Sequence, residues 1–223
     1  MLESRLNTPQ TEPKLNRHCA SGPDPDILAD IYRPDTNIAI WQRTRSENVA
    51  RSVKQFLAQT KHFERTKTVS ARNIQSDIAS LFGSGDFSAL ADDVVEVVDM
   101  FCYLFELERT GLRMAILNRA MCPRFHVDNV PCRLVTTYHG AATEWLAHHS
   151  VDRSKLGRGS NGLTDDESGL YLDSKEINQV NRFDLVLIKG EKWEGNEGAG
   201  LVHRSPEVTE ANKRLFLSLD FSI

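Results

Sequence analysis

The sequence predicts an α+β protein in which a layer of helices precedes a β-sandwich or β-barrel. Two observations carry this prediction. Apolar residues recur at helical spacing in three stretches between residues 46 and 109, whereas the apolar segments after residue 111 are short, suit a pleated surface and alternate with polar loops. Helices followed by strands are typical of α+β domains, because the helices then cover one face of the sheet.

The N-terminal half contains an arm, one strand and three helices. Residues 1–26 are polar, lack periodicity and carry four prolines, which predicts a flexible arm. A short strand is expected at 37–41. Helices are expected at 46–59, after a possible Ser46 N-cap, at 72–82, before Gly83, and at 88–109. The third has the clearest buried stripe, formed by Leu90, Val94, Val97, Val98, Phe101 and Phe105.

The C-terminal half is expected to be β-structure. Strands are predicted at 112–117, 133–138, 185–188 and 214–221, and two long polar loops at about 150–168 and 191–200. Residues 27–223 are therefore expected to form one domain, with a helical layer at about 27–110 and a β core at about 111–223.

Composition excludes several classes of protein. The chain has 223 residues, with 31 acidic against 27 basic side chains and a net charge of −4, so charge gives no reason to expect nucleic acid. No apolar run approaches the length of a membrane span, and the first residues lack the apolar core of a secretory signal, which predicts a cytoplasmic protein without a membrane partner. The four cysteines show no Cys-x-x-Cys spacing and are expected to be free thiols.

A His-x-Asp pair, His126 and Asp128, is the main chemical signal. On an extended backbone, side chains two residues apart point to the same face, so an imidazole and a carboxylate can reach one ion. A third ligand must come from elsewhere, and His203 is the leading candidate. Two histidines and one carboxylate leave coordination positions open, which suits non-haem Fe(II).

Other residues offer competing interpretations of the metal site. His139, His148 and His149 are rival ligands that are expected to be solvated loop residues. Cys122 and Cys132 flank the His-x-Asp pair, but a structural zinc site built on them would leave Asp128 without a role. The sequence contains no Walker motif and no Gly-x-Ser-x-Gly, and the glycines that begin at Gly157-Arg-Gly159 lie in a polar loop without a strand before it, so the sequence gives no support for nucleotide binding or serine hydrolysis.

The order of features around these residues resembles the 2-oxoglutarate/Fe(II)-dependent oxygenase superfamily. The run HVD is followed by an apolar strand, then by FDLVLIKG with Phe183 where the superfamily often has Gly, then by HRSP and RLFLS. The resemblance implies a double-stranded β-helix, a jelly-roll or cupin-like core, with the N-terminal helices packed on one face. It also implies that His126, Asp128 and His203 bind iron.

The same resemblance implies a co-substrate site. Arg214, eleven residues after His203, would hold the distal carboxylate of 2-oxoglutarate, and Ser218 would lie on the same strand face. Arg133, Tyr138 and Asn118 lie on strands near the His-x-Asp pair and are candidates for hydrogen bonds to the co-substrate, with a rim or structural role as the alternative for each.

The block from about residue 111 to residue 221 also resembles a bacterial family of uncharacterised proteins. Members of that family carry strings close to CPRFHVD, TEWL, LIKGE and HRSP. This second resemblance brings no activity with it.

Two functions therefore stay open. The first is an Fe(II)/2-oxoglutarate-dependent oxygenase that hydroxylates a small-molecule or protein substrate, which the sequence does not identify. The second is a cupin-like binder or sensor that holds zinc without redox turnover, because the affinity order of divalent metals favours Zn(II) over Fe(II). Arg214 separates them, since only the oxygenase needs this guanidinium beside the metal.

Overall fold

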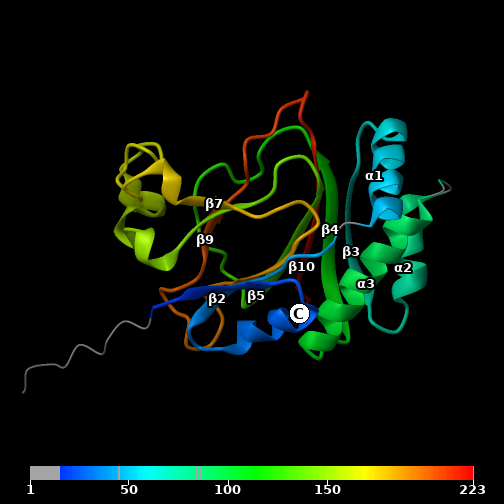
Figure 1. The fold of residues 1–223 in the computed structure, drawn as a ribbon, viewed down its shortest axis with the longest axis horizontal. Helices are drawn as coiled ribbons and strands as arrows, with labels where there is room; N and C mark the ends of the chain where they lie inside the picture. The colour runs from blue at the N-terminus through cyan, green and yellow to red at the C-terminus, as the bar shows by residue number, and fades with distance from the viewer. Residues whose placement is uncertain (1–15, 45, 84, 86, 223) are drawn as a thin grey trace, which may run out of the picture.

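The structure is a computed structural model that describes residues 16–44, 46–83, 85 and 87–222. Within these residues the chain is mixed α+β, with one large and one small sheet (Figure 1). The large sheet has the strand order β1-β2-β8-β5-β10-β4-β3 and the small sheet the order β7-β6-β9. Neighbouring strands are antiparallel except β1 and β2, which are parallel.

The strands of the described residues are β1 His18–Gly22, β2 Thr36–Trp41, β3 Glu64–Ser70, β4 Arg109–Leu117, β5 Cys132–His139, β6 Glu144–Leu146, β7 Ile177–Gln179, β8 Leu185–Lys189, β9 Val202–Arg204 and β10 Arg214–Phe221. The α-helices are α1 Glu47–Gln59, α2 Ile74–Phe82 and α3 Ser88–Leu104. Short 3-10 helices are η1 Pro25–Tyr32, η2 His148–Ser150, η3 Arg153–Lys155, η4 Gly157–Ser160 and η5 Ser174–Glu176.

The large sheet separates two apolar cores. Side chains alternate between the two faces of a strand, and β10 shows the division. Leu215, Leu217 and Leu219 belong to the core that includes residues of α1, α2 and α3, whereas Phe216 belongs to a second core with Val135 of β5 and residues of β2 and β8. The candidate site therefore lies on the face of the sheet that the three helices do not cover.

The helices pack where the sequence predicts a helical layer, with one difference in length. They begin at Glu47, Ile74 and Ser88, within two residues of the expected starts. The third was expected to reach residue 109 but ends at Leu104. Glu106 adopts a φ of 52°, and the N–H of Leu107 bonds to the carbonyl of Cys102, a helix-ending arrangement that the apolar stripe does not reveal.

Two strands of the large sheet lie within residues 27–110, the stretch expected to form mainly a helical layer. β2 matches the strand expected at 37–41, whereas β3 was not expected from the sequence. β3 is an edge strand with Val69 as its only buried residue, so it has no apolar alternation to detect. The expected arm at 1–26 also differs: residues 1–15 lie outside the described residues, but His18–Gly22 forms β1 beside β2.

Phe183 occupies a backbone conformation that favours glycine. Its φ is 72°, a region that bulky residues rarely adopt. Two contacts hold it there: the Phe183 N–H donates to the carbonyl of Thr137 at 2.9 Å, and Arg43 Nε donates to the Phe183 carbonyl at 2.8 Å. The side chain packs against Tyr138 on the helix side of the sheet. Packing and hydrogen bonds thus stabilise Phe183 in a conformation that favours glycine.

The small sheet and the connection between β6 and β7 lie away from the helices, at the other end of the molecule (Figure 1). Among the described residues, no helix combines the length and the apolar character needed to cross a membrane.

Candidate metal centre

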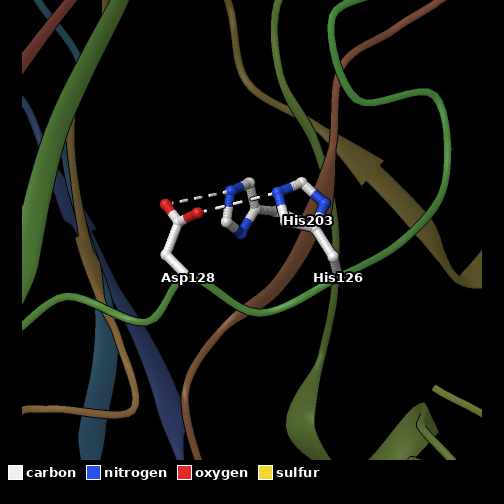
Figure 2. A group of neighbouring side chains, drawn as sticks. All are labelled: His126, Asp128 and His203. Carbon is white, nitrogen blue, oxygen red and sulfur yellow. Dashed lines mark ion pairs between the residues drawn. The ribbon is translucent and has the colours of Figure 1, made fainter. Parts of the chain in front are cut away.

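The structure brings His126, Asp128 and His203 together although His203 lies 75 positions after Asp128 in the sequence. His126 and Asp128 lie on the connection between β4 and β5, and His203 lies in β9. The main chains of His126 and His203 exchange two hydrogen bonds of 3.0 Å, which form an isolated β-bridge. This bridge makes the backbone at His126 extended and fixes both imidazoles beside Asp128 (Figure 2).

The three side chains present one ligand atom each within 4.8 Å of one another. His126 Nε2 lies 3.6 Å from Asp128 Oδ1, and His203 Nε2 lies 3.5 Å from Asp128 Oδ2 (Figure 2). In an octahedral site with bonds of about 2.1 Å, neighbouring ligand atoms lie about 3.0 Å apart. The two distances from an imidazole to the carboxylate therefore exceed the octahedral value by about half an ångström, a difference that small side-chain movements can remove. The three residues are the only such group of three or more His, Cys, Asp or Glu residues in the described part of the chain.

Hydrogen bonds set the tautomer of both histidines. Nδ1 of His126 donates to the carbonyl of Arg124 at 3.0 Å, and Nδ1 of His203 donates to the carbonyl of Leu201 at 3.1 Å. A proton held on Nδ1 leaves the Nε2 lone pair free, and in each residue Nε2 is the atom that faces Asp128. Both imidazoles are thus prepared to donate to a metal.

Burial and neighbouring charges keep His203 and Asp128, but not His126, in the protonation states that a metal requires. Burial lowers the pKa of His203 to about 4, so its imidazole is neutral near pH 7. Burial favours a protonated Asp128, but the hydrogen bond from His126 and the charges of His203 and Arg133 outweigh it and lower the pKa of Asp128 to about 2. Burial also favours a neutral His126, but its contacts with Asp128 and the Arg124 carbonyl raise its pKa.

Arg133, a predicted co-substrate residue, contacts the metal ligands instead. Its Nη1 donates to Asp128 Oδ2 at 2.7 Å, while Nε and Nη2 form a bidentate pair with Asp220 of β10 at 2.7 and 3.1 Å. The planar guanidinium therefore orients the carboxylate of Asp128. Arg133 also lines the cavity beside the two histidines. It is therefore part of the site, but its hydrogen-bond partners are Asp128 and Asp220.

Arg214 is a buried cation without an acidic partner. It is 1% exposed, and no carboxylate of the described residues lies within 4.0 Å of its guanidinium. Its nitrogens donate to the hydroxyls of Thr137, at 3.1 and 2.8 Å, and of Thr143, at 2.9 Å, and its guanidinium lies 4.7 Å from the ring centroid of Phe216. Burial lowers its pKa to about 10, which still leaves it charged near pH 7.

Arg214 and the two histidines line one cavity of about 50 Å³. The cavity also contacts Arg133, Val135, Phe216 and Arg204 from the two sheets, and Met121, Cys122, Thr143 and Ser205 from the connections. An unpaired buried cation beside a metal site is costly unless an anion joins it.

The remaining predicted co-substrate residues lie elsewhere. Tyr138 is buried on the helix side of the sheet, where its hydroxyl donates to Asp93 of α3 at 2.7 Å. Asn118 is exposed and donates to Glu210. Ser218 is buried on the same face of β10 as Arg214, but it does not line the cavity. The expected role of Tyr138 and Asn118 as co-substrate residues was wrong, because neither side chain faces the metal centre.

Sequence reasoning missed the two threonines that hold Arg214. Thr137 follows Arg133 by four residues on β5, so the two-residue period of a strand places both on one face and would have indicated Thr137. Thr143 lies just before β6, and nothing in its neighbourhood signals that it reaches the same guanidinium.

The rival metal ligands do not gather at a second site within the described residues. His139, His148 and His149 contribute to no such group. Cys122 lines the cavity, but Cys132 is buried in the core on the helix side, where burial raises the pKa of its thiol well above the usual range. Both are free, as expected from their spacing, and they form no zinc site with the histidines.

A family profile described as "Protein of unknown function (DUF1826)" matches residues 22–220. No curated protein matches the sequence.

Solved structures with a similar fold include several oxygenases. A dioxygenase for auxin oxidation from rice is 12% identical, with a TM-score of 0.47 and coverage of 86% of this chain and 75% of that one. HygX from Streptomyces hygroscopicus, with nickel and 2-oxoglutarate bound, is 10% identical, with a TM-score of 0.46 and coverage of 88% and 85%. A Pseudomonas putida prolyl-4-hydroxylase is 10% identical, with a TM-score of 0.43 and coverage of 87% and 96%. Similarity at this level carries no conclusion about activity.

Proposed function

We propose that this chain, which belongs to the DUF1826 family of proteins of unknown function, is an Fe(II)- and 2-oxoglutarate-dependent oxygenase with a double-stranded β-helix core. One observation carries the proposal: Arg214, a buried arginine that pairs with no acid among the described residues, shares a cavity with the two histidines of the His-Asp-His set. The core between the two sheets, in which Phe216 and Val135 pack, supports the jelly-roll architecture.

Four side chains would form the proposed iron site. His126, Asp128 and His203 would hold Fe(II), which supplies the redox chemistry that protein side chains lack. Arg133 holds the carboxylate of Asp128 through the contact described above.

Arg214 provides the second binding element. Its guanidinium is fixed by Thr137 and Thr143, so it is already oriented for a carboxylate. An arginine fork pairs with a carboxylate through two hydrogen bonds, and burial strengthens that pair because water cannot compete. A dicarboxylic acid that reaches both the metal and Arg214 would be held at both ends, and 2-oxoglutarate is such a molecule.

The size of the cavity favours a second candidate, a zinc-binding protein without redox turnover. A volume of about 50 Å³ accommodates one or two water molecules and is too small for a five-carbon dicarboxylate. The oxygenase therefore requires the wall to open, and the parts of the wall outside the large sheet include the connection that carries Met121 and strand β9, which carries Arg204. A zinc binder requires no such movement.

Titration with 2-oxoglutarate distinguishes the two candidates. Wild type, Arg214→Ala and Arg214→Lys are loaded with Fe(II) without oxygen, and the metal-to-ligand charge-transfer band is followed as 2-oxoglutarate is added. Wild type should develop the band. Arg214→Ala should keep the metal but bind 2-oxoglutarate more weakly by roughly 2–5 kcal/mol, as when one partner of a buried charge pair is removed. Arg214→Lys should recover part of the loss, because an ammonium cannot form the fork.

Arg113→Ala is the matched control. Arg113 lies on β4 directly opposite Ser218 of β10, but it pairs with Glu64 on the other side of β4. This variant should bind 2-oxoglutarate like wild type. Equal affinity in all variants, or no band from an iron-loaded wild type, would reject the oxygenase and favour the zinc protein.

A further inference from the structure

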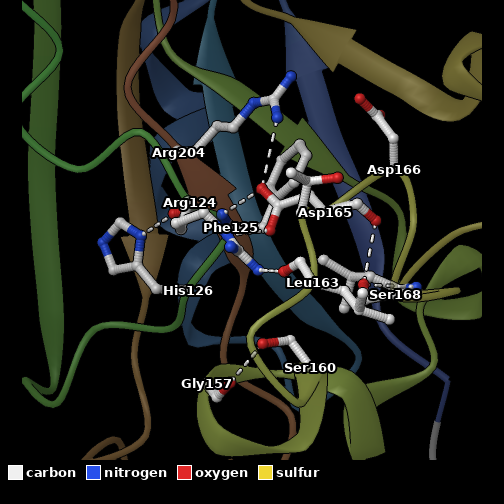
Figure 3. Close-up of polar contacts among 12 residues, drawn as sticks. Arg124, Phe125, His126, Gly157, Ser160, Leu163, Asp165, Asp166, Ser168 and Arg204 are labelled. Atoms are coloured by element: carbon white, nitrogen blue, oxygen red, sulfur yellow. Dashed lines mark hydrogen bonds and ion pairs between the residues drawn. The ribbon is translucent and has the colours of Figure 1, made fainter.

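A buried carboxylate outside the metal centre contacts the chain segments of both histidines. Asp165 lies on the connection between β6 and β7 and is 6% exposed. Its Oδ1 accepts from Arg124 Nε at 2.7 Å, and its Oδ2 accepts from the Phe125 N–H at 2.9 Å and lies 3.4 Å from Arg204 Nη1 (Figure 3). One carboxylate thus binds two arginines and a backbone amide.

These partners are the immediate neighbours of the histidine ligands. Arg124 and Phe125 precede His126, and Arg204 follows His203. The carbonyl of Arg124 accepts the hydrogen bond from His126 Nδ1 that fixes the tautomer of that ligand (Figure 3). Asp165 therefore holds the two residues on which the orientation of His126 depends, and it ties them to the strand that carries His203.

The segment around Asp165 is itself attached to the same place. Arg124 Nη2 donates to the carbonyl of Leu163 at 2.6 Å, and Ser168 Oγ donates to the carbonyl of Asp165 at 3.0 Å (Figure 3). Phe125 packs in a small apolar core with Leu170 and Tyr171. Apolar contacts therefore join the same two segments that the hydrogen bonds of Asp165 join.

Asp165 supplies one of the two carboxylates that face the arginines of this cluster. Glu144 of β6 pairs with Arg204 Nε at 2.7 Å, so two carboxylates, those of Glu144 and Asp165, face two guanidinium groups, those of Arg204 and Arg124. Removing the charge of Asp165 takes from Arg124 the one acid that it pairs with among the described residues, and it leaves the Phe125 N–H with a weaker acceptor.

We propose that Asp165 is a positioning residue for the metal centre, which holds His126 in its metal-binding tautomer and keeps the His126 and His203 segments in register. The inference rests on the proposed metal centre but not on the use of 2-oxoglutarate. It also assigns a purpose to the long connection between β6 and β7: docking of residues 163–168 completes the site.

The test uses the metal-free protein as well as the metal-bound one. At a pH above the raised pKa of His126, NMR of ¹⁵N-histidine-labelled wild type should show the neutral imidazole protonated on Nδ1, and in Asp165→Asn it should show a mixture of tautomers. Co(II) affinity, measured by competition with a chelator, should fall about tenfold in Asp165→Asn, the lower end of the range for residues that orient metal ligands. Asp166→Asn is the matched control, because Asp166 contacts Tyr171 and none of the ligand-bearing residues. It should match wild type in both measurements.

A purely structural role for Asp165 predicts a different pattern. Asp165→Asn would then lower the thermal midpoint, but the folded protein would keep the wild-type tautomer of His126 and a Co(II) affinity within twofold of wild type. That result would overturn the inference. An equal loss in Asp166→Asn, or a wild type that binds no Co(II), would overturn it too. Should Asp165→Asn fail to fold, Arg124→Gln removes the same ion pair from a half-exposed side chain, and it must shift affinity and tautomer in the same direction.

An iron-loaded wild type that binds no 2-oxoglutarate would reject the oxygenase and leave this inference standing. Neither the tautomer of His126 nor the Co(II) affinity depends on the co-substrate.

Discussion

The two histidine ligands differ in their surroundings, although both hold Nδ1 on a carbonyl. His203 is buried, and its side chain is 8% exposed, whereas that of His126 is 32% exposed. Burial dominates at His203 and lowers its pKa to about 4, but contacts with Asp128 and Arg124 dominate at His126 and raise its pKa. Near neutral pH the proton that competes with a metal is therefore the one on His126.

Metal affinity should depend on pH through His126. A metal needs the Nε2 lone pair, which protonation removes, so affinity should fall as pH falls through the raised pKa of His126, above the ordinary value of 6.5. His203 adds a further loss only as pH approaches its pKa of about 4. Co(II) titrations in steps between pH 5 and 8.5 measure this dependence. His149→Asn, a change at an exposed histidine outside the centre, should leave the profile unchanged. An affinity constant across pH 6–8 would contradict the prediction.

Residues of the candidate site differ in how far the sequence predicts them. His126 and Asp128 form a local pattern that any extended backbone would place on one face, so the sequence suffices for them. Arg133 and Tyr138 are five residues apart on β5, so an uninterrupted strand puts them on opposite faces and only one could enter the cavity. Which of the two enters depends on the pairing of β5 with β10 and β8, and no local pattern determines that pairing.

Helix α3 contacts the large sheet through a buried polar cluster as well as through apolar side chains. Asp93 of α3 accepts from the Tyr138 hydroxyl of β5 at 2.7 Å and forms a bidentate pair with Arg43 at 3.0 and 3.2 Å. Arg43 also donates to the carbonyl of Phe183. The cluster joins a helix, a central strand and the turn before β8 on the face opposite the metal centre.

Tyr138→Phe should therefore lower stability without affecting the site. The change removes one hydrogen bond to a buried carboxylate that keeps its arginine partner, so the free energy of unfolding should fall by about 1–2 kcal/mol. Urea denaturation measures this loss. Co(II) and 2-oxoglutarate affinities should stay at wild-type values, because the hydroxyl points away from the cavity. A tenfold loss of 2-oxoglutarate affinity at unchanged stability would instead mean that the Tyr138 hydroxyl contacts the co-substrate.

Elements with a strong periodic pattern were predicted well, and short or edge elements were not. The apolar stripes of α1, α2 and α3 face the core and appear directly in the sequence. β6, β7 and β9 have three residues each, fewer than any alternation needs, and β1 is largely exposed. β9 nevertheless carries His203, so the strand that completes the candidate site is among those that the sequence could not delimit.

For the molecule as a whole, β1 ties the described N-terminal residues to the loop that leads into β9. The strand covers the open edge of β2, in which five of six residues are buried. Just before β1, Arg17 donates to the side chain of Asn196 at 2.8 Å and to the carbonyl of Gly195 at 3.0 Å. Asn196 in turn donates to the carbonyl of Gly190 at 3.1 Å, so the loop between β8 and β9 is held from both ends.

Removing β1 should destabilise the protein. A chain that begins at residue 24 lacks the Arg17 contacts and the pairing with β2 that a chain beginning at residue 16 retains. At about 1 kcal/mol for each net hydrogen bond, a loss of two or more bonds should lower the free energy of unfolding by about 2 kcal/mol or more. For a chain of this size that corresponds to a decrease of about 4–8 °C in the thermal midpoint. Calorimetry on the two chains measures the difference.

A third variant distinguishes the contribution of strand β1 to stability from that of the Arg17 hydrogen bonds. Arg17→Gln in the chain that begins at residue 16 keeps β1 but weakens its tie to the loop, so it should account for only part of the decrease. The shorter chain should also self-associate, because it exposes the apolar edge of β2 to pairing with another copy, and light scattering detects this. Identical midpoints and no association would mean that residues 16–23 form an arm with no part in the core, as the prolines of this region first suggest. A lower midpoint with association would instead make β1 an edge strand that protects the sheet.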